Sequence, residues 1–273
     1  MQRTESARQT IGQTFDELRV RGRIGLMPFL AAGFPNLDAT AACLVALQSA
    51  GASVIELGFP FSDPIADGPV IQEAFTEALS HKIKVADIFA TIRAVRPNLT
   101  IPVVAMVSYS IVFRYGLARF AGEAKAAGFD GLITPDLPPP EAQRVSEQVW
   151  ASELDTILLA SPTTSPARRE QIARLSSGFI YYLSVSGITG ERDQLPPDLV
   201  ANVRQLKQVT ERPVCVGFGI HQPRHVAQLR GIADGAIVGT AYVRRMKQHV
   251  GEGSQRLAEV VGDYTRELLS QAG

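Results

Sequence analysis

Eight short apolar segments, each followed by a stretch with helical periodicity, most constrain the fold of this 273-residue chain. Continuous apolar runs are typical of strands that are buried on both faces, as in parallel sheets. The expected strands are Ile24–Ala32, Ser53–Gly58, Val103–Val107, Gly131–Thr134, Thr156–Leu159, Phe179–Leu183, Val214–Gly217 and Gly235–Val238. Eight strand–helix units in succession fit a closed (β/α)8 barrel better than an open sheet.

Helical segments fill the intervals between these strands and extend beyond both ends of the barrel. They are expected at Asp38–Ala50, Pro69–Leu79, Val85–Val95, Gly116–Ala127, Pro140–Ala151, Pro166–Leu175, Asp198–Val209, Pro223–Leu229 and Ala241–His249, with Asp38 as the N-cap of the first. An extra N-terminal helix is expected at about residues 6–21 and a C-terminal helix at about 255–270, around a barrel at about 24–250. No linker-like segment interrupts this pattern, so we predict one α/β TIM-barrel domain over residues 1–273.

Charge and cysteine content limit which ligands and which cell compartment the sequence predicts. Lys+Arg and Asp+Glu both total 27, so no wide basic field would attract nucleic acid. The polar N-terminus lacks a signal-peptide core, and no apolar run approaches the roughly 20 residues of a membrane span. Cys43 and Cys215 lie far apart in apolar runs, which is typical of packed free thiols. We therefore expect a cytoplasmic protein with a small-molecule ligand.

An acidic residue interrupts the second expected strand. Side chains alternate along a strand, so Glu56 shares a face with Val54 where an apolar residue would be expected. A carboxylate inside a buried strand is costly unless it is paired or used. An apolar setting would raise its pKa toward general acid/base use. Glu56 lies near the carboxyl end of its strand, so we favour catalysis over a structural, hydrogen-bonded acid.

Two further acids follow in the loop after this strand. Asp67 precedes Gly68-Pro69, so it either belongs to the site or caps the next helix. The residues themselves favour neither role for Asp67. Asp63 precedes Pro64 and is more typical of a turn.

Glycine-rich turns follow the last two expected strands, where barrels often bind phosphate. Glycine lets backbone N–H groups approach an anion, and a following helix N-terminus adds favourable partial charge. We expect Gly219, Gly239 and Thr240 to converge there, with Gly190 closing from the loop after strand six. The alternative is that these residues only form tight strand–helix turns.

Missing residue types also limit the chemistry. None of the five lysines follows a strand directly, where a Schiff-base aldolase would need one. The four histidines form no sequence cluster typical of a metal site, so no metal is expected. Carbon–carbon cleavage here would require a substrate that supplies its own electron sink.

Several motifs together resemble those of the tryptophan synthase α-subunit family, and the match runs through nearly the whole chain. They are Glu56-Leu57-Gly58, Pro60-Phe61-Ser62-Asp63-Pro64, Ala66-Asp67-Gly68-Pro69, Pro135-Asp136-Leu137-Pro138, Ser186-Gly187-Ile188-Thr189-Gly190 and Gly217-Phe218-Gly219-Ile220. The resemblance implies a lyase that splits indole-3-glycerol phosphate into indole and glyceraldehyde 3-phosphate. Protonation of the indole ring at C3 gives an electron-accepting indolenine, so such a retro-aldol step needs neither lysine nor metal.

The resemblance also implies roles for individual residues. Glu56 matches the family's general acid/base, and Asp67 matches the carboxylate that holds the indole N–H. Thr189 matches a residue that hydrogen-bonds the loop aspartate when the strand-six loop closes. The positions that match the indole pocket are Phe29, Met106, Ile133, Tyr181 and Phe218, and those that match the phosphate site are Gly190, Gly219, Gly239 and Thr240.

A partner is implied as well. The family works with a pyridoxal-phosphate β subunit in an αββα heterotetramer, and no cofactor is implied in this chain. The matching interface positions include Pro60, Pro64 and Ser110. Ser110 stands where the family usually has asparagine, and Ala31 and Phe34 replace the threonine and frequent aspartate of the strand-one turn.

Three alternatives follow from the same sequence. A free-standing lyase would share the chemistry without a β partner, and a non-catalytic barrel would only activate a β subunit. Glu56 and Asp67 argue against the second, because a pure interaction module need not retain both acids. A phosphosugar isomerase or epimerase has no loop lysine, histidine pair or metal cluster in its favour.

Overall fold

Eight parallel strands form a closed barrel in the order β1 to β8, in a computed structural model that describes residues 8–63, 67–183, 195–217 and 219–271. The strands are β1 (Gly25–Ala31), β2 (Ile55–Gly58), β3 (Val103–Met106), β4 (Gly131–Ile133), β5 (Asp155–Ala160), β6 (Ile180–Leu183), β7 (Val214–Gly217) and β8 (Gly235–Val238). β1 pairs with both β2 and β8, which closes the barrel. The predicted (β/α)8 barrel is thus confirmed.

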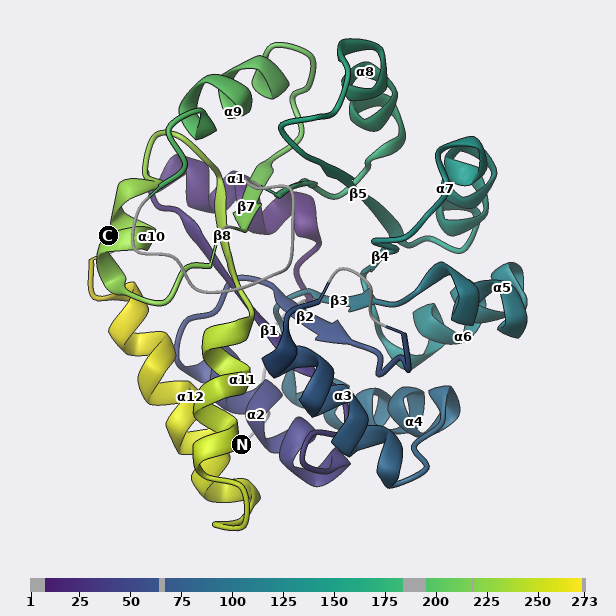
Figure 1. The fold of residues 1–273 in the computed structure, drawn as a ribbon, viewed down its shortest axis with the longest axis vertical. Helices are drawn as coiled ribbons and strands as arrows, with labels where there is room; N and C mark the ends of the chain where they lie inside the picture. The colour runs from purple at the N-terminus through teal and green to yellow at the C-terminus, as the bar shows by residue number, and fades with distance from the viewer. Residues whose placement is uncertain (1–7, 64–66, 184–194, 218, 272–273) are drawn as a thin grey trace, which may run out of the picture.

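Helices surround the barrel (Figure 1). They are α1 (Ile11–Val20), α2 (Leu37–Ser49), α3 (Pro69–Ser80), α4 (Val85–Val95), α5 (Tyr109–Tyr115), α6 (Leu117–Ala127), α7 (Ala142–Ala151), α8 (Pro166–Leu175), α9 (Leu199–Lys207), α10 (Pro223–Gln228), α11 (Thr240–Gln248) and α12 (Ser254–Leu269), with 3₁₀ turns at Arg96–Asn98 and Pro139–Glu141. The C-terminal helix α12 packs on α2 and α11. Within the described residues, no helix combines the length and apolarity of a membrane crossing.

Two details of the helices differ from the sequence prediction. Asn36, and not Asp38, caps α2, because its side-chain oxygen accepts the Ala39 N–H at 2.8 Å. The short helix α5 was not predicted. Its N-cap Ser108 accepts a hydrogen bond from the Ser110 N–H, and it ends at a glycine with positive φ.

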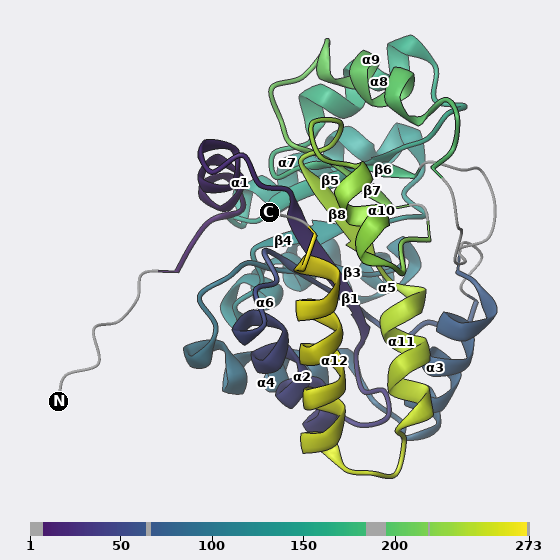
Figure 2. The same ribbon diagram turned by 90° about the vertical axis from the view of Figure 1, so that its left-hand side faces the viewer.

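The N-terminal helix α1 closes one end of the barrel. It begins at Ile11 with a capping box made by Thr10 and Gln13. Its Ile11 and Phe15 belong to the same buried cluster as the inward-facing strand residues, and the Phe15 and Phe179 ring centroids lie 6.1 Å apart. In Figure 2, α1 and α3 lie on opposite sides of the barrel. We call the end closed by α1 the amino end, because it is where the strands begin.

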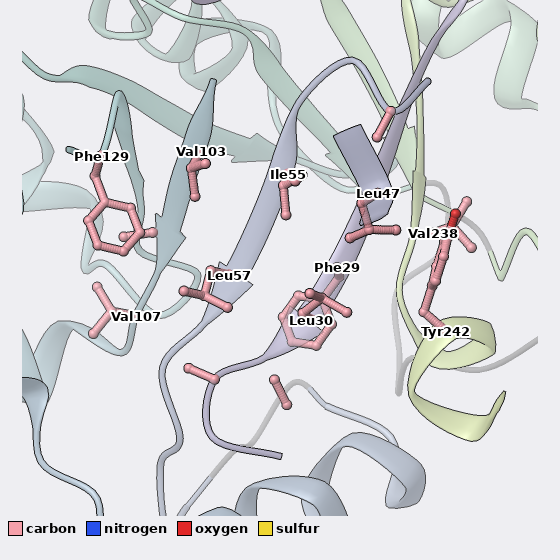
Figure 3. Packing of buried hydrophobic residues seen from close by; sticks show 14 of the residues in the cluster. Phe29, Leu30, Leu47, Ile55, Leu57, Val103, Val107, Phe129, Val238 and Tyr242 are labelled. Carbon is pink, nitrogen blue, oxygen red and sulfur yellow. The ribbon is translucent and has the colours of Figure 1, made fainter. Parts of the chain in front are cut away.

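A second apolar layer fills the space between strands and helices. On β2, Ile55 and Leu57 face this layer, and Figure 3 shows them beside Val103 of β3. Val54 instead belongs to the barrel interior. Because side chains alternate, Glu56 points with Val54 into the barrel, toward its carboxyl end.

Candidate active site

Glu56 lies inside the barrel, on the inward face of β2. In register, it sits between Phe29 on β1 and Val104 on β3. Its side chain is 1% exposed, and within the described part of the chain neither carboxylate oxygen has a partner. Burial, with a smaller contribution from Asp67, raises the pKa of Glu56 to about 8. A buried acid that is largely protonated at neutral pH can donate a proton and take one back.

Asp67 approaches Glu56 from the loop that follows β2. Burial raises the pKa of Asp67 to about 6, so it is mostly ionised at neutral pH. The N-cap of α3 is Gly68, which makes no side-chain capping bond, so Asp67 does not take the capping role left open by the sequence. The Gln72 side-chain amide donates to the Asp67 backbone carbonyl at 2.7 Å, which ties the loop to the first turn of α3.

A cavity of about 280 Å³ with Asp67 in its wall opens at the carboxyl end. It is lined by Phe59, Phe61, Asp63, Asp67, Phe75, Met106, Val107, Ser108, Pro135 and Asp136. Apolar walls with a few convergent polar groups are typical of small-ligand sites. The apolar walls suit an apolar ligand, and the carboxylate of Asp67 can accept a hydrogen bond from it. Across the described ranges, no group of three or more His, Cys, Asp or Glu side chains is placed to hold a metal ion.

The structure brings part of the predicted indole pocket to this cavity. Met106 lines it directly, and Ile133 is its register partner on β4. The Phe29 ring lies against Phe75 of the cavity wall, with centroids 6.4 Å apart. Phe218 lies outside the described residues.

Tyr181 lies close enough to both acids for their charges to raise its pKa. Its pKa is raised well above the ordinary value, first by burial and then by the charges of Glu56 and Asp67. Gly217 on the neighbouring strand makes room for it, because a Cβ there would lie 3.1 Å from the Tyr181 hydroxyl. Glu56, Asp67 and Tyr181 thus face a common region at the carboxyl end.

The predicted phosphate site has two described features that fit an anion. Thr240 is the first residue of α11, and its buried hydroxyl has no hydrogen-bond partner in the described chain. The N-cap Gly239 has no side chain to cap α11 and offers only its backbone carbonyl, which accepts the N–H groups of Tyr242 and Val243. Gly219 has φ +85°, a backbone conformation that favours glycine. Thr189 and Gly190 lie outside the described residues.

The predicted interface positions are dispersed around the rim. Pro60 is buried just after β2, and Ser110 is exposed on α5. Pro64 lies outside the described residues. These positions stay predictions, because the structure contains this chain alone.

Three polar residues of the cavity wall had no assigned site role in the sequence analysis. Asp136 accepts the Ser108 hydroxyl at 2.6 Å and the Tyr109 N–H at 2.7 Å, which joins the ends of β3 and β4. Asp63, interpreted above as a turn residue, also lines the cavity and accepts the Ser62 hydroxyl at 2.9 Å. The available signal was position, since Ser108 and Asp136 each follow a strand closely.

Fold and site together define an enzyme of the (β/α)8-barrel class, with buried acidic groups toward the carboxyl ends of the strands. The family model described as tryptophan synthase alpha chain matches residues 15–269. The chain is 46% identical to the tryptophan synthase alpha chain of Chloroflexus aurantiacus, over 95% of this chain and 97% of that protein. It is 44% identical to the tryptophan synthase alpha chain of Rhodopirellula baltica, over 93% of this chain and 95% of that protein.

Solved structures give the same result. The tryptophan synthase subunit alpha of Legionella pneumophila superposes with a TM-score of 0.88 at 36% identity, over 96% of this chain and 97% of that one. A chain of Mycobacterium tuberculosis tryptophan synthase superposes with a TM-score of 0.84 at 37% identity, over 96% of this chain and 99% of that one. The chain therefore belongs to the tryptophan synthase alpha chain family, as the sequence motifs predicted. The alpha subunit of this family is a lyase that cleaves indole-3-glycerol phosphate.

Proposed function

We propose that this chain cleaves indole-3-glycerol phosphate to indole and glyceraldehyde 3-phosphate, with Glu56 as the proton carrier and Asp67 as the anchor of the indole nitrogen. The burial of Glu56, its unpartnered oxygens and its raised pKa carry this proposal. An unpaired carboxyl group in an apolar setting is otherwise a cost to the fold.

The proposed reaction begins with a proton transfer to the ring. Protonated Glu56 gives its proton to C3 of the indole, which makes the ring an indolenine that accepts electrons. Ionised Asp67 accepts a hydrogen bond from the ring N–H and stabilises the positive charge that develops on nitrogen. The raised pKa of Glu56 and the lower pKa of Asp67 favour this division of protonation states at neutral pH.

Carbon–carbon cleavage follows from the indolenine. The side-chain hydroxyl on the carbon attached to C3 loses its proton to Glu56, and its oxygen forms the aldehyde carbonyl. The electrons of the breaking bond return to the ring and restore the aromatic indole. Glu56 therefore ends the cycle protonated, as it began. The proton count balances with no lysine and no metal in the scheme.

Binding groups extend the proposal around the reacting atoms. We place the indole ring against Met106 and Phe29, with Ile133, Tyr181 and Phe218 completing its pocket. The phosphate would lie at the start of α11, where the unpartnered Thr240 hydroxyl supports an anion site. The further phosphate and loop-closure residues of this proposal are Gly190, Gly219, Gly239 and Thr189.

A partner subunit is also proposed. The family partners with a β subunit. We propose an αββα assembly in which pyridoxal phosphate belongs to the β subunit and Pro60, Pro64 and Ser110 lie at the contact. The cytoplasm suits the two buried free thiols, Cys43 and Cys215.

The deciding experiment is Glu56→Gln in the full chain, with and without a β subunit. Indole release should fall by about 10²–10⁴-fold, the range of general acid–base catalysis, while glycerol phosphate binding is retained. Glu259→Gln, on the exposed face of α12, is the matched control. Near-normal turnover in Glu56→Gln would remove Glu56 from its role. Equal wild-type rates with and without the β subunit would favour a free-standing lyase, and no turnover in either would favour a non-catalytic barrel.

A further inference from the structure

A second cavity lies at the amino end of the barrel, away from the candidate active site. Its volume is about 210 Å³. It is lined by Phe15, Leu18, Arg19, Gly22, Arg23, Ile24, Lys207, Arg230, Gly231, Ala233 and Asp234. These residues come from α1, the end of α9, and the segments that lead into β1 and β8, all of which precede strands.

The wall of this cavity carries an excess of positive charge. Apart from Arg230, which interacts with another group, the lining cations are Arg19, Arg23 and Lys207, and the single lining carboxylate is that of Asp234. Lys207 Nζ lies 3.0 Å from the nearer Asp234 oxygen. One lining acid cannot neutralise these three lining cations, so the cavity favours an anion.

The Asp234 carboxylate already has partners within the fold. Asp234 accepts the backbone N–H of Val214 at 2.8 Å, which holds the start of β7 beside β8. Arg19 pairs with Asp16 at 3.3 Å, but both side chains are more than half exposed, so that pair is weak. Arg23 has no ion pair with any residue that the structure describes.

Two glycines with positive φ form part of the cavity wall. Gly22 has φ +62° and Gly231 has φ +72°, and a Cβ at either position would meet nothing within 4 Å. In the described chain, the Gly231 N–H donates to no acceptor. An anion would therefore find a backbone donor as well as guanidinium groups, which bind phosphate oxygens in a bidentate way.

We propose that this amino-end cavity binds a small phosphate-bearing anion. The volume is below the roughly 300 Å³ of common drug-sized pockets, which suits orthophosphate, pyrophosphate or a short phosphomonoester. Phe15, Leu18 and Ile24 offer an apolar floor for a short organic group. A bound anion would join α1 to the segment before β8 and so stabilise the helix that closes the barrel.

The test uses pyrophosphate with the full chain, titrated at constant ionic strength against chloride. Amide NMR shifts are expected at Gly22, Arg23 and Gly231, separate from any shifts at the start of α11. The variant Arg19→Gln/Arg23→Gln should weaken binding at the amino-end cavity at least about 10-fold, because two charge-assisted contacts are lost. The control Arg256→Gln removes the same type of charge from the exposed face of α12 and should leave the affinity unchanged.

Three results would overturn the proposal. The first is a pyrophosphate response confined to the carboxyl end, and the second is an equal response to chloride. The third is the same affinity in the double variant and in Arg256→Gln. If the double variant does not fold, the single variant Arg23→Gln replaces it. The Arg23 side chain is exposed and has no ion pair in the described chain, so its loss should not disturb the fold. Binding of pyrophosphate should still weaken about threefold, because one charged contact is lost.

Discussion

Buried acidic side chains have different surroundings at the two ends of the barrel. At the amino end, Asp130 accepts the Val103 N–H at 2.9 Å just before β4, and Asp234 accepts the Val214 N–H at 2.8 Å just before β8. Each of these acids holds the start of a neighbouring strand and also pairs with a cation. The amino-end acids are therefore used for stability.

At the carboxyl end, polar groups are buried but left without partners. Glu56 has no hydrogen bond to either oxygen, and the Thr240 hydroxyl also has none in the described chain. Burial without compensation costs about 1–3 kcal/mol per group, which a fold tolerates more readily where a ligand later supplies the partner. Buried hydroxyls without a partner also occur at the amino end, for example those of Thr156 and Ser176. The two ends therefore differ in their acids: those of the amino end pair with cations, whereas Glu56 at the carboxyl end has no partner in the described chain.

After Glu56→Gln, the largest effect that tests this contrast is expected from Asp67→Asn. The amide cannot supply the charge that stabilises the developing positive nitrogen, so kcat for indole release should fall by about 10²–10³-fold. The melting temperature should change little, because Asp67 caps no helix. Asp63→Asn, in the same loop and lining the same cavity, is the matched control for a change in loop charge. Equal losses in the two variants would assign the effect to the loop and not to Asp67.

The sequence was sufficient for the barrel because the pattern is local and repeated. Each strand is a short apolar run and each helix a separate amphipathic segment, so periodicity locates them without tertiary information. Glu56 was identifiable for the same reason, as an acid on the inward face of a strand. The family motifs supplied its chemical role together with that of Asp67.

What the sequence did not predict depends on residues that are distant along the chain. Helix α5 has only seven residues, and Asp136 from another strand–helix unit holds its first N–H group. A short helix of this kind is marginal without such a tertiary contact. The amino-end cavity likewise joins segments around Arg23, Lys207 and Arg230, which no local pattern brings together.

A stability effect of intermediate size is expected from Asp130→Asn at the amino end. Its carboxylate accepts from the mostly buried Arg96 at 2.9 Å and from Arg8 at 2.6 Å. Loss of the charge leaves the Arg96 guanidinium poorly paired, so the free energy of unfolding should fall by about 3 kcal/mol. Asp16→Asn, in an exposed ion pair, should cost less than about 1 kcal/mol. Urea unfolding measures both, and equal costs would contradict the structural role of the amino-end acids.

The smallest effect expected is a pH dependence of stability at the carboxyl end. The folded-state pKa of Glu56 is about 8 and its ordinary value is 4.5, so between these values the folded chain holds a proton that the unfolded chain has released. Stability from this group is therefore present at low pH and falls as pH rises toward 8, by about 1.4 kcal/mol per pH unit. Glu56→Gln cannot titrate and should lose this slope.

The window from pH 6.5 to 7.5 isolates Glu56 in this measurement. Asp67 has a folded-state pKa of about 6, so its own contribution changes mainly below that window. Urea unfolding at the two pH values should show wild type losing about 1 kcal/mol relative to Glu56→Gln. A buried amide adds only a constant offset, because it carries no titrating proton. Parallel stability curves for the two proteins would mean that Glu56 is compensated in the folded chain, and the contrast between the two ends of the barrel would then not hold.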